Sequence, residues 1–194
     1  MQMLKDRIVK DGQVIGTEIV KVDCFLNHQI DVALVSEIGR EFATRFADLP
    51  INKILTIESS GIALACATAM HMGNMGNLPV VFAKKAAPNT MTDGYYSTEV
   101  TSFTKKAVYT VVVSKKYLFE QDNILIIDDF LAYGEAAFGL IDLAKQAGAA
   151  VCGFGAAVEK AFQGGGDKLR KEGYRVESLA VIASIEDDHL TFRE

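Results

Sequence analysis

The sequence predicts a single α/β domain with a mostly parallel central sheet flanked by helices. Two observations support this prediction. Apolar, β-rich runs alternate with stretches of helical periodicity, and several runs are continuously apolar, as in strands that are covered on both faces. The chain has 194 residues, of which 49% are hydrophobic and 23% charged. These values are typical of one folded domain and exclude a disordered chain.

Two helices are predicted before the first strand. Apolar residues at helical spacing in 3–11 predict a short helix, which Gly12 can end. A 3.6-residue apolar period from Asp31 to Ala47 predicts a longer helix with Asp31 as its N-cap.

The next segments predict a strand, a helix and a strand. Residues 53–58 (KILTIE) and 78–83 (LPVVFA) are short apolar runs, and the apolar stretch between them, from Gly61 to about Gly73, predicts a helix. This order at this spacing is typical of a parallel sheet. Residues 84–106 are polar, and we expect a long loop that runs into a hairpin and can serve as a lid.

The rest of the chain continues the alternation. The expected elements are a strand in 107–118, a strand in 124–127, a helix in 134–146, a strand in 149–159, a short helix in 167–172 and one or two strands in 174–186. Residues 164–166 are three glycines, which predict a flexible turn.

Charge and composition exclude several classes of function. The net charge is −5, whereas a general nucleic-acid binder needs an excess of Lys and Arg. No apolar run approaches the roughly 18–20 residues that cross a bilayer, so we expect neither nucleic acid nor membrane as a partner. Cys24, Cys66 and Cys152 lie far apart without ligand spacing, which predicts free thiols in a reducing cytoplasm and no structural zinc site.

The chemically most specific segment is Ile124–Ala136 (ILIIDDFLAYGEA). An apolar run ends in Asp128 and Asp129, and a loop of small residues leads into a helix. In open α/β sheets, ligands bind at the carboxyl ends of strands, and the free N–H groups at a helix start suit a phosphate. Paired acids can bind a sugar diol or assist a divalent cation. The alternative is an ordinary strand that ends in solvated acids, and the P-loop and dinucleotide motifs are absent.

This segment resembles the phosphoribosyl-pyrophosphate signature of type I phosphoribosyltransferases. That signature has four hydrophobic residues, two acids, two hydrophobic residues and a small phosphate loop. The stretches 21–31 (KVDCFLNHQID), 56–62 (TIESSGI) and 158–163 (VEKAFQ) are similar to bacterial members of the family that act on xanthine. The similarity extends from about Leu4 to Phe192.

The resemblance implies a fold and a reaction. The expected fold is the type I phosphoribosyltransferase fold over residues 1–194, with a small hood formed by about 1–30 and 160–194. The expected reaction is purine salvage, in which xanthine and 5-phosphoribosyl 1-pyrophosphate (PRPP) give xanthosine 5′-monophosphate and pyrophosphate. Mg²⁺ is expected to arrive with PRPP rather than through direct ligation by the protein. A cytoplasmic homodimer is also implied.

The resemblance also implies the roles of particular residues. Asp128 and Asp129 are the expected catalytic pair, which contacts the ribose and lies near the positive charge of the transition state. The expected PRPP-binding residues are Ser59, Ser60, Gly61, Lys84, Lys85, Ala132, Tyr133, Gly134, Glu135 and Ala136. The expected xanthine-binding residues are Val20, Asn27 and Lys160. The family usually has a hydroxyl or amide residue where this chain has Tyr133 and often glutamine where it has Glu135.

Each of these groups has a plainer interpretation. Ser59 or Ser60 can simply cap a helix, and the two lysines of 84–85 can be a solvated pair. Lys160 can be a surface residue at a strand end, Asn27 a turn residue and Val20 part of the core.

Three alternative functions remain open at this point. Guanine or hypoxanthine could replace xanthine as the base. Tyr133 and Glu135 could weaken the enzyme. A PRPP-sensing transcriptional regulator belongs to a different class, and such regulators carry an extra N-terminal DNA-binding domain. Because only about 30 residues precede the helix at Asp31 and the chain is acidic, we expect an enzyme instead.

Overall fold

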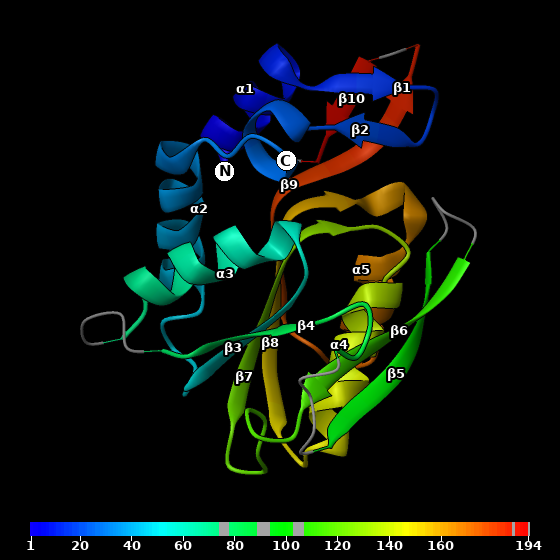
Figure 1. Cartoon of the computed structure of the whole chain (residues 1–194). Coiled ribbons are helices and arrows are strands. Elements are labelled where there is room, and N and C mark those ends of the chain that lie inside the picture. Colours follow the sequence, from blue (N-terminus) through cyan, green and yellow to red (C-terminus); the bar gives the residue numbers. More distant parts are fainter. Residues whose placement is uncertain (74–77, 89–93, 103–106, 188, 194) are drawn as a thin grey trace.

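The predicted α/β architecture is confirmed by a computed structural model, which describes residues 1–73, 78–88, 94–102, 107–187 and 189–193. Within these residues, the central sheet has six strands in the order β10-β9-β8-β7-β3-β4 (Figure 1). Neighbouring strands from β4 to β9 are parallel, and β10 is antiparallel to β9.

The helices are α1 (Gln2–Asp11), α2 (Val32–Arg45), α3 (Ser60–His71), α4 (Glu135–Gln146) and α5 (Gly165–Lys171), with a π-helical turn η1 (Asp23–Asn27) and a 3-10 turn η2 (Ala161–Gln163). The strands are β1 (Gln13–Ile15), β2 (Ile19–Lys21), β3 (Lys53–Ile57), β4 (Val80–Ala83), β5 (Tyr95–Ser102), β6 (Ala107–Ser114), β7 (Asn123–Leu131), β8 (Ala150–Lys160), β9 (Val176–Glu186) and β10 (His189–Phe192).

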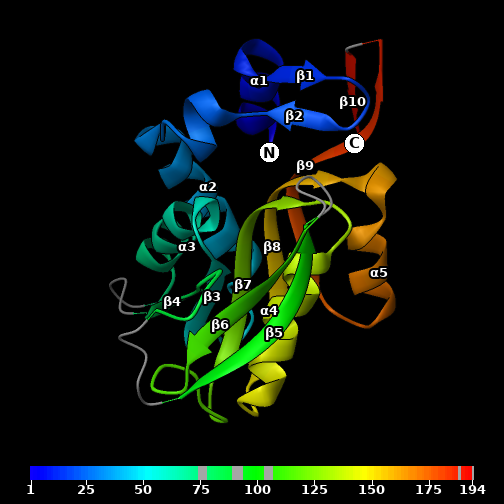
Figure 2. The same cartoon turned by 45° about the vertical axis from the view of Figure 1, so that its right-hand side comes forward.

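The sheet is covered on both faces, which explains its continuously apolar strands. Successive side chains point to opposite faces. Leu125 and Ile127 of β7 join the hydrophobic cluster that contains α2 and α3, whereas Ile124 and Ile126 join the cluster that contains α4 and the β5–β6 hairpin. Figure 2 shows these two layers on either side of the sheet.

A small group of elements lies at one end of the molecule, and we call it the hood: α1, β1, β2, η1, β10 and the adjoining end of β9 (Figure 1). Leu4 and Ile8 of α1 are buried in the same cluster as Leu179 and Ile182 of β9. Helix α5 lies outside this group, because its Leu169 packs in the cluster with α4. The hood therefore combines both ends of the chain.

The hairpin expected at the end of 84–106 is confirmed, but its first strand, β5, already begins at Tyr95, so residues 95–102 are a strand and not a loop. This strand pairs antiparallel with β6 from Tyr95↔Ser114 to Ser102↔Ala107, and a bridge between Lys84 and Val112 joins the hairpin to the chain after β4. Polar residues alternate with Tyr96 and Val100, which pack toward α4. The strand is half-buried, so its overall polarity concealed the alternation. Residues 89–93 and 103–106 of the expected loop lie outside the described residues.

Several element boundaries also differ from the predictions. Strand β7 extends to Leu131, which pairs with Glu159, so the two acids lie inside the strand rather than after it. Strand β4 begins at Val80 rather than 78, and α5 begins at Gly165 rather than 167. Residues 176–186 form one continuous strand. No helix of the described residues is both long and apolar enough to cross a membrane.

The strand order places a ligand crevice between β3 and β7. The chain passes from β3 outward to β4 and then returns to β7 on the other side of β3. In open α/β sheets, ligands bind outside the carboxyl ends of the strands at such a reversal. The residues that follow β3 and those at the end of β7 meet there.

Candidate active site

A cavity of about 250 Å³ lies at the carboxyl ends of β3 and β7. We call it the acidic cavity, because Glu58 and the two aspartates line it. Its other lining residues are Ile57, Ser59, Ser60, Lys85, Tyr109, Phe130 and Ala136. The structure thus brings together the acid pair, the turn after β3 and one of the two predicted lysines.

Asp128 is the buried member of the acid pair. Its side chain is almost fully inaccessible, and its Oδ1 accepts a hydrogen bond from the Asp129 backbone N–H at 3.0 Å. Burial raises the pKa of Asp128 well above its usual range, and the adjacent Asp129 carboxylate raises that pKa further. The fold therefore penalises a second negative charge at this position, so an incoming cation or developing positive charge would be favoured there.

A hydrogen bond joins the turn after β3 to the turn after β4. The Lys85 backbone N–H donates to Glu58 Oε1 at 2.7 Å, and the Lys85 ammonium lies 5.7 Å from the Tyr109 ring centroid. Lys84 differs, since it lines neither this cavity nor the adjoining one, and its ammonium lies 5.5 Å from the Phe82 ring centroid. Lys85 therefore supplies the cationic charge of this cavity.

Gly61 allows α3 to begin directly against the acid pair. A Cβ at this position would lie 2.1 Å from Thr56 Oγ1 and 3.0 Å from Asp128 Oδ1. Ser59 is the N-cap of α3, yet its side chain makes no capping hydrogen bond. The plain capping role considered for Ser59 is therefore not observed.

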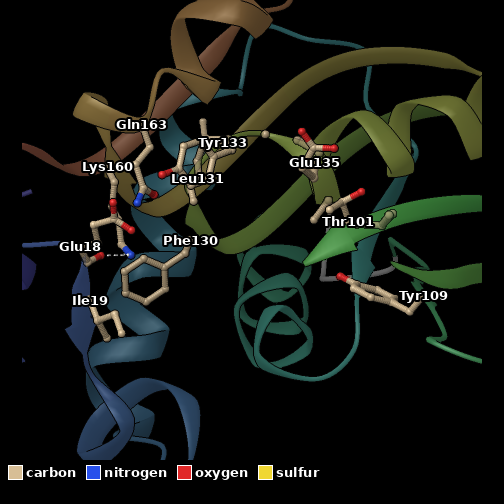
Figure 3. Close-up of a pocket in the computed structure, with 15 residues that line it drawn as sticks. Glu18, Ile19, Thr101, Tyr109, Phe130, Leu131, Tyr133, Glu135, Lys160 and Gln163 are labelled. Carbon is tan, nitrogen blue, oxygen red and sulfur yellow. Dashed lines mark hydrogen bonds between the residues drawn. The ribbon is translucent and has the colours of Figure 1, made fainter. Parts of the chain in front are cut away.

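A second cavity, of about 400 Å³, adjoins the first, and we call it the loop cavity (Figure 3). The loop 130–137 lines it, and the two cavities share Tyr109, Phe130 and Ala136. Gly134 caps α4 with a φ of +94°, a conformation that glycine adopts without strain. The predicted phosphate loop thus meets the start of a 12-residue helix, where free N–H groups favour an anion. Glu135 also lines this cavity, beside Thr101 in Figure 3.

Lys160 ends β8 at the boundary between this cavity and the hood. Its ammonium donates a hydrogen bond to the Glu18 backbone carbonyl at 2.7 Å and lies 5.5 Å from the Phe130 ring centroid. Burial lowers the pKa of Lys160. Figure 3 shows Lys160, Phe130 and Ile19 around one end of the cavity. A flat ring could be held there by apolar contacts and a polar donor.

The other two predicted base-binding residues lie in the hood. The Asn27 side-chain amide donates to Asp129 Oδ2 at 2.6 Å, so this residue contacts the acid pair directly. Val20 is buried in the hydrophobic cluster of the hood. Neither residue lines the two cavities.

The sequence analysis missed several residues that line the loop cavity. Val100, Thr101 and Tyr109 come from the β5–β6 hairpin, and Glu18 and Gln163 come from the edges of β2 and η2. Burial raises the pKa of Tyr109, and the charge of Asp128 adds to this effect. Only Gln163 carried a signal, because it belongs to the stretch VEKAFQ that also contains Lys160.

This arrangement suits a ligand with an anion at each end and a polar centre. Helix N–H groups adjoin the loop cavity, and the two acids line the adjoining acidic cavity together with Lys85 and the serine turn. The described residues contain no group of three or more His, Cys, Asp or Glu side chains that could hold a metal ion.

Comparisons with known proteins identify the family. No protein-family model matches the chain. The chain is 54% identical over 194 residues to the xanthine phosphoribosyltransferase of Ruminiclostridium cellulolyticum, with 100% of both chains covered. It is 51% identical over 193 residues to the xanthine phosphoribosyltransferase of Clostridium tetani, again with 100% of both chains covered.

This chain belongs to the xanthine phosphoribosyltransferases. The predicted family, enzyme class and type I phosphoribosyltransferase fold are thereby confirmed. Among solved structures, the chain resembles the adenine phosphoribosyltransferase of Trypanosoma brucei in complex with AMP, pyrophosphate and ribose 5-phosphate. The TM-score is 0.72 at 19% identity, and the match covers 92% of this chain and 78% of the other. At this identity the likeness supports the fold alone.

Proposed function

We propose that this xanthine phosphoribosyltransferase transfers the phosphoribosyl group of PRPP to N9 of xanthine, which forms xanthosine 5′-monophosphate and releases pyrophosphate. The observation that supports the proposal is that the acid pair lines one cavity with Lys85 and the serine turn, and that this cavity adjoins the one lined by the loop 130–137. The relatives that are 51–54% identical are named for this activity.

The two cavities divide PRPP between them. The backbone N–H groups of the loop 132–136 at the start of α4 bind the 5′-phosphate. Ser59, Ser60 and the Lys85 ammonium bind the pyrophosphate, because they line the opposite side of the acidic cavity. Asp128 and Asp129 lie between these regions and accept hydrogen bonds from the ribose hydroxyls. Lys84 makes no cavity contact in this structure, so we assign it no direct role with the donor.

Catalysis in this site is mainly a matter of charge. When the bond between the ribose and pyrophosphate breaks, positive charge develops on the sugar ring and negative charge on the leaving group. The carboxylates of 128 and 129 stabilise the first charge, and Ser59, Ser60 and the Lys85 ammonium stabilise the second. Because these groups are already in place, little reorganisation is needed during the reaction.

The donor set also fits a Mg²⁺ ion that arrives with PRPP. Mg²⁺ keeps several waters and binds through one or two carboxylates plus substrate phosphates. Glu58, Asp128 and Asp129 line the acidic cavity beside the proposed pyrophosphate site, and their carboxylates would attract the ion through its waters without ligating it directly. When bound, the ion would neutralise part of the pyrophosphate charge and make it a better leaving group.

Lys160 is the residue that selects a 6-oxopurine. Its ammonium can donate to the exocyclic O6, whereas adenine presents an amino group at this position. The adjacent Phe130 ring supports the purine plane. Xanthine, guanine and hypoxanthine all carry O6, so Lys160 alone does not separate them. The Asn27 amide lies on the hood side and can read the 2-oxo group that distinguishes xanthine, and Val20 backs this region.

We further propose that the enzyme is a cytoplasmic homodimer. The Ser36 hydroxyl and His71 Nε2 lie 3.1 Å apart and join α2 to α3. Val32, four residues before Ser36 in α2, and Met70, next to His71 in α3, expose 75% and 74% of their surfaces. Contiguous exposed apolar side chains are typical of a protein contact, and we propose that α2 and α3 supply such a surface. The three cysteines are free, in keeping with a reducing compartment.

A base-selectivity assay tests the proposed function. Purified protein is incubated with PRPP, Mg²⁺ and either xanthine, guanine or hypoxanthine, and nucleotide formation is followed spectrophotometrically. We expect the highest kcat/KM with xanthine. Asp129→Asn should lower kcat by about 10²-fold or more, since it removes a charge that faces the developing positive centre. Higher kcat/KM with guanine or hypoxanthine would correct the base, and an unchanged rate in the variant would remove Asp129 from the mechanism.

A further inference from the structure

The glycine segment Gly164–Gly166 touches the loop that we assign to the 5′-phosphate. The Gly165 N–H donates a hydrogen bond to the Ala132 carbonyl at 3.0 Å. A Cβ at Gly165 would lie 2.4 Å from the Ala132 carbonyl oxygen and 2.6 Å from the Gly134 nitrogen. Distances this short leave no room for any side chain, so the backbones of the two segments are in direct contact.

On its other side, the same segment packs against a buried carboxylate. A Cβ at Gly166 would lie 2.1 Å from Glu159 Oε1. Glu159 is fully buried, and it accepts hydrogen bonds from two Arg170 nitrogens at 2.9 and 2.8 Å and from the Ser178 hydroxyl at 2.5 Å. Burial opposes ionisation, but the bonds from Arg170 and Ser178 hold the pKa of Glu159 below its usual range.

These contacts form a continuous support behind the loop. Glu159 belongs to β8 and directly precedes Lys160, and Arg170 belongs to α5, which begins at Gly165. The ion pair therefore fixes α5 to the sheet, and Gly165 at the start of α5 fixes the loop. Leu169, which is fully buried with the α4 cluster, adds an apolar anchor.

We propose that Gly165 and the Glu159–Arg170 pair are positioning residues for the donor: they hold the loop 132–136 with its N–H groups aimed at the 5′-phosphate. This inference rests on the proposed function, because it assumes that the loop binds that phosphate. The physical basis is preorganisation. A loop that must be ordered on binding loses part of its binding energy, whereas a loop already fixed retains it.

The proposal predicts a selective effect of Gly165→Ala. The added methyl group must push the loop or α5 aside, so we expect the KM for PRPP and the inhibition constant of ribose 5-phosphate to rise about 10-fold or more. The inhibition constant of pyrophosphate should change less than about 2-fold, since its proposed site lies at Glu58–Ser60 and Lys85. A general loss of stability would instead raise the inhibition constants of ribose 5-phosphate and pyrophosphate by the same factor, or change neither.

Gly173→Ala is the matched control. Gly173 lies just after α5 with a φ of +88°, and a Cβ there meets nothing within 4 Å. This variant strains the backbone at the far end of the same helix, so it should lower the melting temperature but leave both inhibition constants unchanged. Equal ratios of the two constants in Gly165→Ala and the wild type would overturn the proposal.

Amide hydrogen exchange provides a readout that needs no activity. Without any substrate, peptides covering 130–138 should exchange faster in Gly165→Ala and in Arg170→Lys than in Gly173→Ala. Unchanged protection of this loop in both variants would overturn the proposal even if the enzyme turns over xanthine. A different outcome separates the two proposals. If the loop exchanges faster in the variants but the wild-type protein neither uses PRPP nor binds ribose 5-phosphate, the contact between Gly165 and the loop is supported and the proposed function is refuted.

Discussion

Asp128, a proposed catalytic residue, lies where the fold disfavours its ionised form. Its carboxyl is buried beside Asp129, and both burial and the neighbouring charge raise its pKa. The unfolded chain has no such penalty, so folding costs free energy whenever Asp128 must ionise. Polar groups that destabilise the fold are typical of catalytic sites.

Asp128→Asn should therefore raise stability while it removes activity. The folded-state pKa lies above the unfolded value of about 3.9, so the unfolding free energy of the parent falls as pH rises from about 4 through the folded pKa. Asparagine avoids this loss and can still accept the Asp129 N–H. At pH 8 we expect a gain of about 1 kcal/mol, or roughly 2–4 °C in melting temperature. The gain should vanish near pH 4.

Melting curves of parent and variant between pH 4 and pH 8 check this prediction. Asp142→Asn, at an exposed position of α4, is the control and should show no such trend. A stability difference that instead grows toward low pH would contradict the assigned cause. The variant's kcat should fall by about 10²-fold or more throughout.

At the scale of elements, one hydrogen bond joins the hood to the proposed catalytic acid pair. Asn27 belongs to η1 in the hood, and its amide donates to Asp129 Oδ2 in β7. A second bond, from Lys160 to the Glu18 carbonyl, joins β8 to the hood near β2. These two hydrogen bonds join the hood to the proposed site, and under the proposed function PRPP and a purine would replace them with their own groups.

Asn27→Asp should impair the enzyme more than Asn27→Ala. Alanine only removes the bond, and we expect a rise of about 10-fold in the KM for xanthine. Aspartate places a carboxylate where a 2.6 Å hydrogen bond stood, so repulsion from Asp129 should open the hood and lower kcat/KM further. Steady-state kinetics with both substrates measure kcat/KM for the two variants. Because salt screens repulsion between charges, the difference in kcat/KM between Asn27→Asp and Asn27→Ala should become smaller at high salt. Equal kcat/KM values would show that the hood contact is incidental.

The elements that the sequence predicted are those whose side chains follow one simple period. The apolar run 53–58 predicted β3, which ends at Ile57, and the apolar period from Asp31 predicted α2. The start of β5 was not predicted within the expected loop and hairpin, because only one face of the strand is buried and its exposed face is polar. The contact between Gly165 and Ala132 is also invisible in sequence, since these residues are far apart along the chain and meet only when α5 packs.

The residues of the candidate site also fall into those that a local sequence pattern predicts and those that only the fold brings together. A strand followed by acids and small residues is a local pattern, and it identifies Asp128, Asp129 and the loop 132–136 because those residues adjoin one another along the chain. Thr101 and Tyr109 reach the cavity from a hairpin. No local pattern marks these two residues, because their place depends on how the hairpin packs on α4.

At the scale of the whole molecule, the two ends of the parallel strands differ in what they hold: one end holds the proposed site and the other holds a structural ion pair. The carboxyl ends of β3 and β7 hold the site. The opposite ends hold a buried ion pair, in which the Lys53 ammonium lies 2.5 Å from Asp122 Oδ2. Lys53 also donates to the Tyr117 carbonyl at 2.9 Å, and Asp122 accepts the Phe119 N–H at 2.8 Å. At about 3.3 Å per strand residue, this pair lies roughly 16 Å from Glu58.

Lys53→Met should separate stability from function. Removing one partner leaves the Asp122 carboxylate buried without its cation, which costs about 3–5 kcal/mol or roughly 6–20 °C in melting temperature. Adding Asp122→Asn removes the orphaned charge, so the double variant should regain part of this loss. Well below the melting temperature, the KM values for xanthine and PRPP should stay within about 2-fold of the parent, because the carboxyl-end turns remain in place. Calorimetry and steady-state kinetics measure the two effects, and a selective rise in the KM for PRPP would show that the two ends of the parallel strands are coupled.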